Sequence, residues 1–375
     1  MKDTSLRELA QLFLKLGTVA FGGPAAHIAM MQDEVVDRRK WFSRQRFLDL
    51  VGATNLIPGP NSTELAIHIG YERAGWAGLL IAGSSFILPA TFIVMGFAWA
   101  YVEYGSTPTG EALLYGVQPV VIAIVAHALA KLAPTAARDW LLRGVVVAAV
   151  VLFLTGVNEL LILFGLGLLV MLVQVTARFG FGASNLFFPL PVIVLVQGTD
   201  SPVSLDRLFL VFLKIGAVLY GGGYVILAFL QNDLVERLGW LTQQQLIDAV
   251  SVGQVTPGPL FTTATFIGYV LEGVPGALVA TLAIFLPSFF FVAITHRYIE
   301  RMRSSPWFSG LLDGVNAAAV GLMGGVTIEL AREAIVDVRT VVVAVVALVL
   351  LVATRVNSAW LILAGGAMGI AFDLL

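Results

Sequence analysis

The sequence predicts an all-α polytopic membrane protein with two inverted-topology repeats, each with about five crossings plus broken or re-entrant helices. Three observations lead to this fold class. The 375 residues are 58% hydrophobic and 12% charged, whereas a soluble domain carries about 25% charged residues. The first part of the chain recurs in the second half, and the positive charges of the two copies fall in different loops.

Composition also excludes several functional classes. A formal net charge of −2 offers no basic surface to a nucleic acid. The absence of cysteine removes disulfides, thiolate metal sites and cysteine nucleophiles. The Gly165-Leu166-Gly167 sequence lies inside an apolar stretch and lacks the strand–helix context of a dinucleotide loop. We therefore expect no cofactor and no metal, and a membrane protein that is not an enzyme.

Uninterrupted apolar stretches predict the crossing helices, because a hydrocarbon core about 30 Å thick needs roughly 20 apolar residues in helical form. Some stretches are short and need flanking residues to complete a crossing. The predicted spans are Trp76–Tyr101, Ala112–Ala130, Val145–Val157, Leu160–Val175, Val274–Thr295, Leu311–Leu330, Thr340–Ala353 and Ala359–Leu375.

Four further apolar segments are interrupted by glycine or proline clusters. Proline lacks an amide donor and glycine permits positive φ, so a helix with such a cluster in mid-span is broken or re-entrant. Unpaired backbone at that depth persists only where protein or a wet cavity satisfies it. The interruptions are Phe21–Pro24, Pro58–Pro60, Tyr220–Gly223 and Pro257–Pro259.

The four interruptions are two copies of one pattern. Leu12–Pro60 aligns with Val211–Pro259 without a gap, and 18 of the 49 pairs are identical. After one deletion, Pro89 aligns with Pro287. The chain is therefore an internal duplication, with a first repeat at 1–180, a linker at 181–204 and a second repeat at 205–375.

The distribution of Lys and Arg indicates that the two repeats have opposite orientations. The loop after the first broken segment is strongly positive in the first half and holds Arg38, Arg39, Lys40, Arg44 and Arg46, whereas its counterpart keeps only Arg237. The loop after the first uninterrupted span reverses this: Val102–Glu111 has no Lys or Arg, and its counterpart has Arg297, Arg301 and Arg303. Equivalent loops on opposite faces of the bilayer are the signature of an inverted repeat.

Inversion requires an odd number of crossings between equivalent points of the two copies. Five crossings per half meet this requirement if the first broken segment crosses and the second is re-entrant, and we favour this arrangement. Four per half plus a crossing near Leu186–Val196 would also meet it. The side of the N-terminus stays open.

Paired interrupted helices in inverted repeats are typical of secondary transporters whose halves meet near the midplane. The N-terminus of a half-helix has unpaired amides and a partial positive charge, which suits an anion. Polar side chains follow each proline triplet and either donate to an oxyanion or only cap the half-helices. Their duplication beside the breaks favours binding by Asn61, Ser62 and Thr63 in the first half and by Thr262 and Thr263 in the second.

Lys15 and Lys214 lie at equivalent positions in apolar runs just before the glycine clusters. A lysine at the bilayer centre costs roughly 2.5–3.5 kcal/mol, so it is expected to face a partner or a wet cavity. The alternative is that both lysines snorkel to an interface. Two lysines would suit a divalent anion better than a monovalent one.

Glu64 and His68 form a further candidate pair, spaced i and i+4 on one helix face. An intramembrane carboxylate beside a histidine is a reasonable proton-coupling site. A structural pair, or a carboxylate that only stabilises the helix N-terminus, is an equal alternative.

These motifs resemble the chromate ion transporter family, specifically its two-domain, long-chain members. The resemblance covers both halves and rests on Phe21-Gly22-Gly23-Pro24, Asn55–Glu64 and Gly70-Tyr71 followed by Gly75–Gly78, with second-half counterparts Tyr220–Gly223 and Gln254–Pro259. It implies antiparallel halves and a substrate site at the breaks. The candidate substrate-binding residues are Lys15, Gly22, Gly23, Asn55, Pro58, Gly59, Pro60, Asn61, Ser62, Thr63, Lys214, Gly221, Gly222, Gln254, Pro257, Gly258, Pro259, Thr262 and Thr263.

The resemblance implies an exporter of chromate in the cytoplasmic (inner) membrane that confers chromate resistance and is driven by protons or by the membrane potential. The alternative is an importer or exchanger of sulfate or another small anion on the same fold. An intramembrane chromate reductase is disfavoured because cysteine and cofactor loops are missing. Expected partners are a small oxyanion, with sulfate as the competing ligand, and the lipid bilayer. Coupling to protons and a homodimer both stay open.

Overall fold

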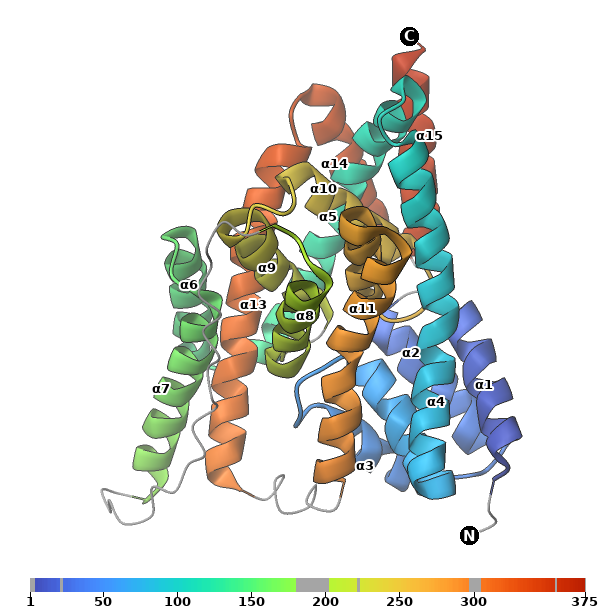
Figure 1. Ribbon diagram of the computed structural model, residues 1–375. Coiled ribbons are helices and arrows are strands. Elements are labelled where there is room, and N and C mark those ends of the chain that lie inside the picture. Colours follow the sequence, from blue (N-terminus) through green and yellow to red (C-terminus); the bar gives the residue numbers. More distant parts are fainter. Residues whose placement is uncertain are drawn as a thin grey trace.

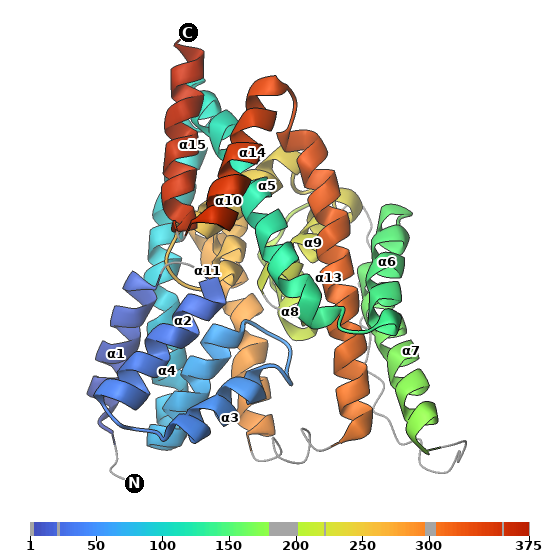
Figure 2. The same cartoon turned by 180° about the vertical axis from the view of Figure 1, so that it is seen from behind.

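The computed structural model describes residues 4–20, 23–179, 202–220, 223–296, 305–354 and 356–374, and these residues form helices and connecting turns without a strand. Figures 1 and 2 show the arrangement from two sides. In the first half the helices are α1 Leu6–Val19, α2 Gly23–Gln32, the π-helical η1 Asp33–Arg38, α3 Arg44–Thr54, α4 Asn61–Tyr104, α5 Pro108–Ala136, α6 Trp140–Leu154 and α7 Glu159–Phe179.

The second half repeats this order element by element. Its helices are α8 Leu205–Val218, the 3₁₀ turn η2 Gly223–Val225, α9 Ile226–Leu230, the π-helical η3 Gln231–Arg237, α10 Gln243–Val255, the 3₁₀ turn η4 Leu260–Thr262, α11 Thr263–Thr295, α13 Pro306–Ala334, α14 Val338–Ala353 and α15 Ser358–Asp373. Six of the eight predicted spans are helical throughout, and the other two extend a few residues beyond the ends of α6 and α15; the all-α prediction is confirmed.

The first broken segment is a re-entrant hairpin. At its open end the Arg39 guanidinium lies 2.7 Å from a Glu8 carboxylate oxygen. Farther in, Lys15 Nζ lies 2.7 Å from Glu34 Oε1, and near the tip His27 Nε2 lies 3.0 Å from the Ala20 carbonyl oxygen. Contacts in this antiparallel order mean that the chain enters and leaves on one face.

The expectation that this first segment crosses the bilayer is therefore wrong. The 14 residues of α1 reach about 21 Å at 1.5 Å per residue, which is short of a full crossing. The chain then breaks after Ala20, and α2 and η1 return to the starting face. The alternative crossing near Leu186–Val196 lies outside the described residues.

The second broken segment is also re-entrant, as expected. It comprises α3, the Pro58–Pro60 break and the first part of α4, and its open ends are joined by an ion pair between Arg46 and Glu72. Beyond Glu72 the chain reverses at Ala74 and Gly75, whose φ/ψ values are not helical. Gly78 packs directly on Gly70, since a Cβ added to Gly78 would collide with the Gly70 carbonyl group. In a straight helix these two residues, eight positions apart, would be about 12 Å from each other.

The second repeat has the same reversal in the opposite direction. Glu272 and Gly273 break α11 as Ala74 and Gly75 break α4. In Figure 1 the long second part of α4 rises to the top of the molecule, whereas that of α11 descends to the bottom beside α3. Among the described residues, five helices are long and apolar enough to cross a membrane: α4, α5, the helix at Glu159–Thr176 within α7, the η4–α11 helix at Leu260–Thr295, and Trp307–Ala334 of α13.

Packing joins the two repeats closely. In both views α6 and α7 of the first repeat lie along α13, and α14 and α15 lie along α5. Glycines allow the backbones to touch: a Cβ on Gly116 of α5 would collide with Gly365 and Gly369 of α15. Such small-residue contacts are typical of membrane helices. The predicted linker 181–204 lies mostly outside the described residues.

Candidate functional site

The tips of the re-entrant hairpins meet crosswise at the centre of the molecule. The Gly59 amide nitrogen of the first repeat donates to the Leu219 carbonyl oxygen of the second over 2.9 Å. The Gly258 amide donates to the Ala20 carbonyl oxygen over 3.0 Å, which is the same bond related by the internal repeat. Each proline triplet therefore rests on the first hairpin of the other half.

The two loop glycines are required by both conformation and space. Gly59 has φ +138° and Gly258 has φ +97°, values that residues with a Cβ rarely adopt. A Cβ on Gly59 would collide with Glu64 Oε1 and lie 2.6 Å from Ser288 Oγ. A Cβ on Gly258 would lie 2.5 Å from the Ala90 methyl group. The loops approach α11 and α4 this closely only because they have no side chain at these positions.

Unpaired polar groups gather around these tips. Two half-helices start here, one after Pro60 and one after Pro259, and their first amides have no partner within the helix. Hydroxyl groups on or beside these starts are buried and have no hydrogen-bond partner among the described residues: Ser62, Thr63, Thr263 and Ser288. Buried polar groups are normally paired, so this set fits a ligand with several acceptor oxygens.

The two half-sites differ in polarity. Glu64 is fully buried, and neither carboxylate oxygen has a partner among the described residues. The second half has only threonines, Thr262 and Thr263, at the equivalent place, and the mate of Ser288 is Ala90. Tyr220 lies at the tip of the second repeat's first hairpin, close enough for its hydroxyl group to interact electrostatically with the Glu64 carboxylate. The first proline loop therefore carries a carboxylate that the second lacks.

Other predicted site residues support the loops. Asn61 Nδ2 donates to Asn55 Oδ1 over 2.8 Å and closes the first loop across Pro58 and Pro60. Thr262 Oγ1 donates to the Pro259 carbonyl oxygen over 2.9 Å and does not cap the following helix with its side chain, so binding of an anion by Thr262 stays a prediction.

At the second loop, Gln254 Oε1 accepts from Tyr224 at 3.4 Å, just ahead of Pro257. Gly23 begins α2, and the predicted Gly22, Gly221 and Gly222 lie outside the described residues.

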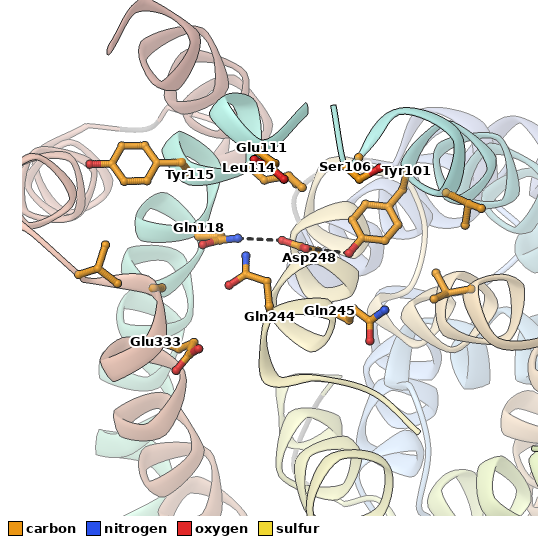
Figure 3. A pocket seen from close by; sticks show the side chains of 15 residues that line it. Tyr101, Ser106, Glu111, Leu114, Tyr115, Gln118, Gln244, Gln245, Asp248 and Glu333 are labelled. Atoms are coloured by element: carbon orange, nitrogen blue, oxygen red, sulfur yellow. Dashed lines mark hydrogen bonds between the residues drawn. The ribbon is translucent and has the colours of Figure 1, made fainter. Parts of the chain in front are cut away.

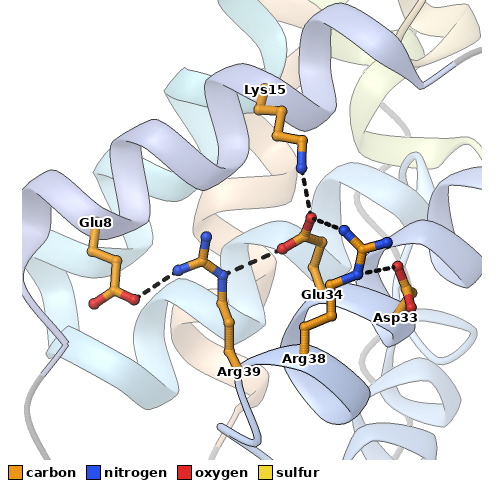
Figure 4. A network of polar contacts seen from close by, with 6 residues as sticks. All are labelled: Glu8, Lys15, Asp33, Glu34, Arg38 and Arg39. Carbon is orange, nitrogen blue, oxygen red and sulfur yellow. Dashed lines mark hydrogen bonds and ion pairs between the residues drawn. The ribbon is translucent and has the colours of Figure 1, made fainter.

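The lysines lie in the legs of the hairpins, away from the tips. Figure 4 shows Lys15 joined to Glu34, which also contacts Arg38 and Arg39 at 3.4 Å. The hydrogen bond from Lys15 lowers the pKa of Glu34, so this carboxylate is held charged. The Lys15 side chain remains 55% exposed. Direct contact of Lys15 with an oxyanion stays a prediction.

Lys214 forms the same pair at a more buried place. Its Nζ lies 2.7 Å from Asp233 Oδ1 and 3.6 Å from Glu159 of α7. Only 12% of the Lys214 side chain is exposed, and the two carboxylates are buried. The mates Glu34 and Asp233 are aligned in the sequence, and this repeated acidic position is a signal that sequence reasoning missed.

His68 lies one helical turn beyond Glu64 and is also buried. Its Nδ1 lies 3.2 Å from Nδ1 of His296, which follows α11 of the second repeat. No local sequence pattern pairs His296 with His68, because the two residues are 228 positions apart in the chain. Ser288 was missed for the same reason, since no sequence pattern places it against Gly59.

A cavity of about 700 Å³ lies on the face opposite the N-terminus. It is lined by the end of α4, the start of α5, α10 and the end of α13, and Figure 3 shows its polar side chains. Buried Asp248 accepts from Tyr101 Oη and from Gln118 Nε2, both at 2.9 Å. With Glu111 and Glu333 also present and no Lys or Arg in its lining, the cavity is electronegative.

Comparisons with known proteins agree with this architecture. The family model described as "Chromate transporter" matches residues 7–171 and 207–370. The chain is 34% identical to the "Probable chromate transport protein" of Synechococcus elongatus, covering 92% of this chain and 89% of that protein. It is also 34% identical to the "Chromate transport protein" of Cupriavidus metallidurans, covering 97% and 92%, and to that of Pseudomonas aeruginosa, covering 88% and 82%.

No solved structure matches the chain. The match of the family model to both halves, together with one-third identity over almost the whole chain, establishes the relationship. This protein belongs to the chromate transporter family.

Proposed function

We propose that the protein is a secondary active transporter that exports chromate across the cytoplasmic membrane and so confers chromate resistance. The observation that carries this proposal is the crossed pair of proline loops, with two half-helix N-termini and unpaired hydroxyl groups between the inverted repeats. Such a centre suits the binding and release of an anion. Three relatives named for chromate transport supply the identity of the ion.

Chromate is a tetrahedral dianion whose oxygens all accept hydrogen bonds. The free amides at the start of α4 and η4 point toward the centre. Each helix N-terminus also carries about half a positive charge from the helix dipole. The hydroxyls of Ser62, Thr63, Thr263 and Ser288 supply further donors that do not need a counter-charge. Sulfate has the same shape and charge and is the competing ligand.

Glu64 links binding to protons. A carboxylate and a dianion in one buried site repel each other, so the anion is held only when Glu64 carries a proton. Transport of one dianion with one proton moves one net negative charge. The outward step then gains about 2.3 kcal/mol per 100 mV of inside-negative potential and loses about 1.4 kcal/mol per unit of pH gradient. The membrane potential is therefore the main driving force for export.

The charges on the two faces favour the same direction. The loop around Arg38–Arg46 is positive, and positive loops lie on the cytoplasmic side. The opposite face has the cavity lined by Glu111, Asp248 and Glu333. A cytoplasmic basic surface attracts the anion, and an outer acidic cavity opposes its return.

The alternative, uptake or exchange of sulfate, uses the same observation, the buried and unpaired Glu64: a proton carried with the anion would let an inward proton gradient drive uptake where no membrane potential opposes it. Everted membrane vesicles distinguish the two. Chromate uptake that needs an inside-positive potential and is inhibited by sulfate supports the exporter. Uptake of sulfate by right-side-out vesicles on acidification, without chromate flux in either orientation, supports the alternative.

A further inference from the structure

A histidine contact joins the two repeats beside the central carboxylate. His68 belongs to the re-entrant leg of α4, and His296 follows the last residue of α11. Their Nδ1 atoms are 3.2 Å apart, so one ring donates a hydrogen bond to the other. Any relative movement of the repeats at this place must break the contact.

Beyond His296 the contacts continue to the face that carries the N-terminus. His296 Nε2 lies 3.3 Å from Glu72 Oε1. Glu72 in turn pairs with Arg46, which is 44% exposed. Both nitrogens of the His296 ring are therefore engaged, one toward the interior and one toward the surface.

Toward the interior, the next titratable side chain on the same helix is Glu64. His68 Nε2 is buried and has no partner among the described residues, and the same holds for both Glu64 oxygens. The two side chains are four residues apart on one helix, which places them on the same face. The line of side chains from the centre to the surface consists of Glu64, His68, His296, Glu72 and Arg46. Two further titratable groups lie beside it: Tyr220 near Glu64, and Tyr71 against the ring of His296.

The second repeat has no equivalent line. A threonine, Thr262 or Thr263, stands for Glu64, and Phe266 and Val270 stand for His68 and Glu72. Phe266 packs against the ring of Tyr101 with 5.1 Å between centroids. A phenylalanine ring neither accepts nor releases a proton. The line of titratable side chains therefore connects the centre with the N-terminal face and not with the opposite face.

We propose that His68, His296 and Glu72 form a one-sided proton path between Glu64 and the N-terminal face, with the His68–His296 contact as a connection that opens when the repeats move. This proposal rests on the proposed function, because it supplies the proton that Glu64 exchanges. When the repeats move so that the anion site opens to the opposite face, the histidine contact would break and Glu64 would lose its connection to the N-terminal face.

The transfer needs one water as a relay between Glu64 and His68, because these two side chains are not hydrogen-bonded to each other. The Glu64 carboxyl group releases its proton to this water, which passes a proton to Nε2 of His68, and the Nδ1 proton of His68 passes to Nδ1 of His296. The Nε2 proton of His296 then passes to Glu72 and from there to water. Each ring gains one proton and loses one, so both return to the neutral state as the other tautomer.

The test uses purified transporter in proteoliposomes with a pH-sensitive dye inside and an imposed potential. Chromate flux and proton flux are measured for the wild type, Glu64→Gln, His296→Ala and His127→Ala, the last being a control histidine of α5. In His296→Ala we expect the proton flux to fall roughly 10- to 100-fold, the usual contribution of a positioned proton carrier. Chromate binding stays within about twofold of the wild type, which shows that the variant is folded, and His127→Ala keeps both fluxes.

Added imidazole provides the decisive measurement. His296 is partly exposed, so imidazole can occupy the space left by alanine and restore the proton flux, which a purely structural role would not predict. Wild-type proton flux in His296→Ala, or a loss that imidazole does not restore, overturns the path. If Glu64→Gln keeps the wild-type proton flux, proton coupling at Glu64 fails instead. A wild type without chromate flux refutes the proposed function itself.

Discussion

Gly59 donates its amide proton to the Leu219 carbonyl oxygen, so the break in one repeat is completed by the backbone of the other. Gly258 and Ala20 make the equivalent bond. Backbone groups in mid-membrane have no water to bond, so their pairing across the repeats holds the two broken regions together. The centre of the molecule is therefore also the joint between its halves.

Gly59→Ala should abolish transport. Glycine adopts the φ of +138° without strain, whereas any other residue would pay about 1–3 kcal/mol in backbone strain. The new methyl group would also collide with Glu64. Gly156→Ala is the matched control, because Gly156 also has a positive φ but a Cβ added there would meet nothing within 4 Å. Chromate flux and thermal unfolding in detergent measure both variants. Equal effects at the two positions would mean that the close approach at Gly59 is unimportant.

Glu64→Gln should remove the pH dependence of chromate binding while leaving binding itself intact. In the wild type the anion needs protonated Glu64, so affinity falls as pH rises through the pKa of this carboxyl group, by up to about tenfold per pH unit. Glutamine mimics the protonated form at every pH and gives a flat profile. Titration of chromate binding between pH 5 and 9 measures this, and a wild-type slope in Glu64→Gln would return Glu64 to a structural role.

Lys214→Ala should destabilise the protein more than Lys15→Ala. Removing Lys214 leaves buried Glu159 without its ion-pair partner, whereas Asp233 keeps Arg237, and breaking a buried pair costs about 3–5 kcal/mol. Glu34 keeps Arg38 and Arg39 when Lys15 is removed. Thermal unfolding in detergent measures the difference, with exposed Lys131→Ala as the control. Chromate binding below the unfolding temperature tests the separate prediction that the lysines contact the anion.

Single cysteines at Gln45 and Gln244 should react from opposite sides of the membrane. These residues are repeat mates near the starts of α3 and α10, and the natural chain has no other cysteine. The positive loop predicts that Gln45→Cys is cytoplasmic and that a membrane-impermeant maleimide labels it only in everted vesicles. Gln244→Cys should be labelled only in right-side-out vesicles. Labelling of both variants from one side would contradict the inversion.

The sequence by itself determined the helical class, the duplication and the places where helices break. Each of these depends on residues close in the chain: apolar runs long enough for a helix, and glycine or proline that interrupts it. The predicted loops Pro58–Pro60 and Pro257–Pro259 are the centre of the molecule, and Glu64 and His68 do share one buried helix.

Only the tertiary structure decided how these pieces meet. Arg39 beside Glu8 shows that the first segment returns to its own face, and Lys15 and Lys214 have carboxylate partners in the hairpin legs. His68 with His296 and Gly59 with Leu219 join residues far apart in the chain. Hydropathy and spacing describe each segment alone, whereas these contacts depend on which helix faces pack together, and no local pattern records that choice.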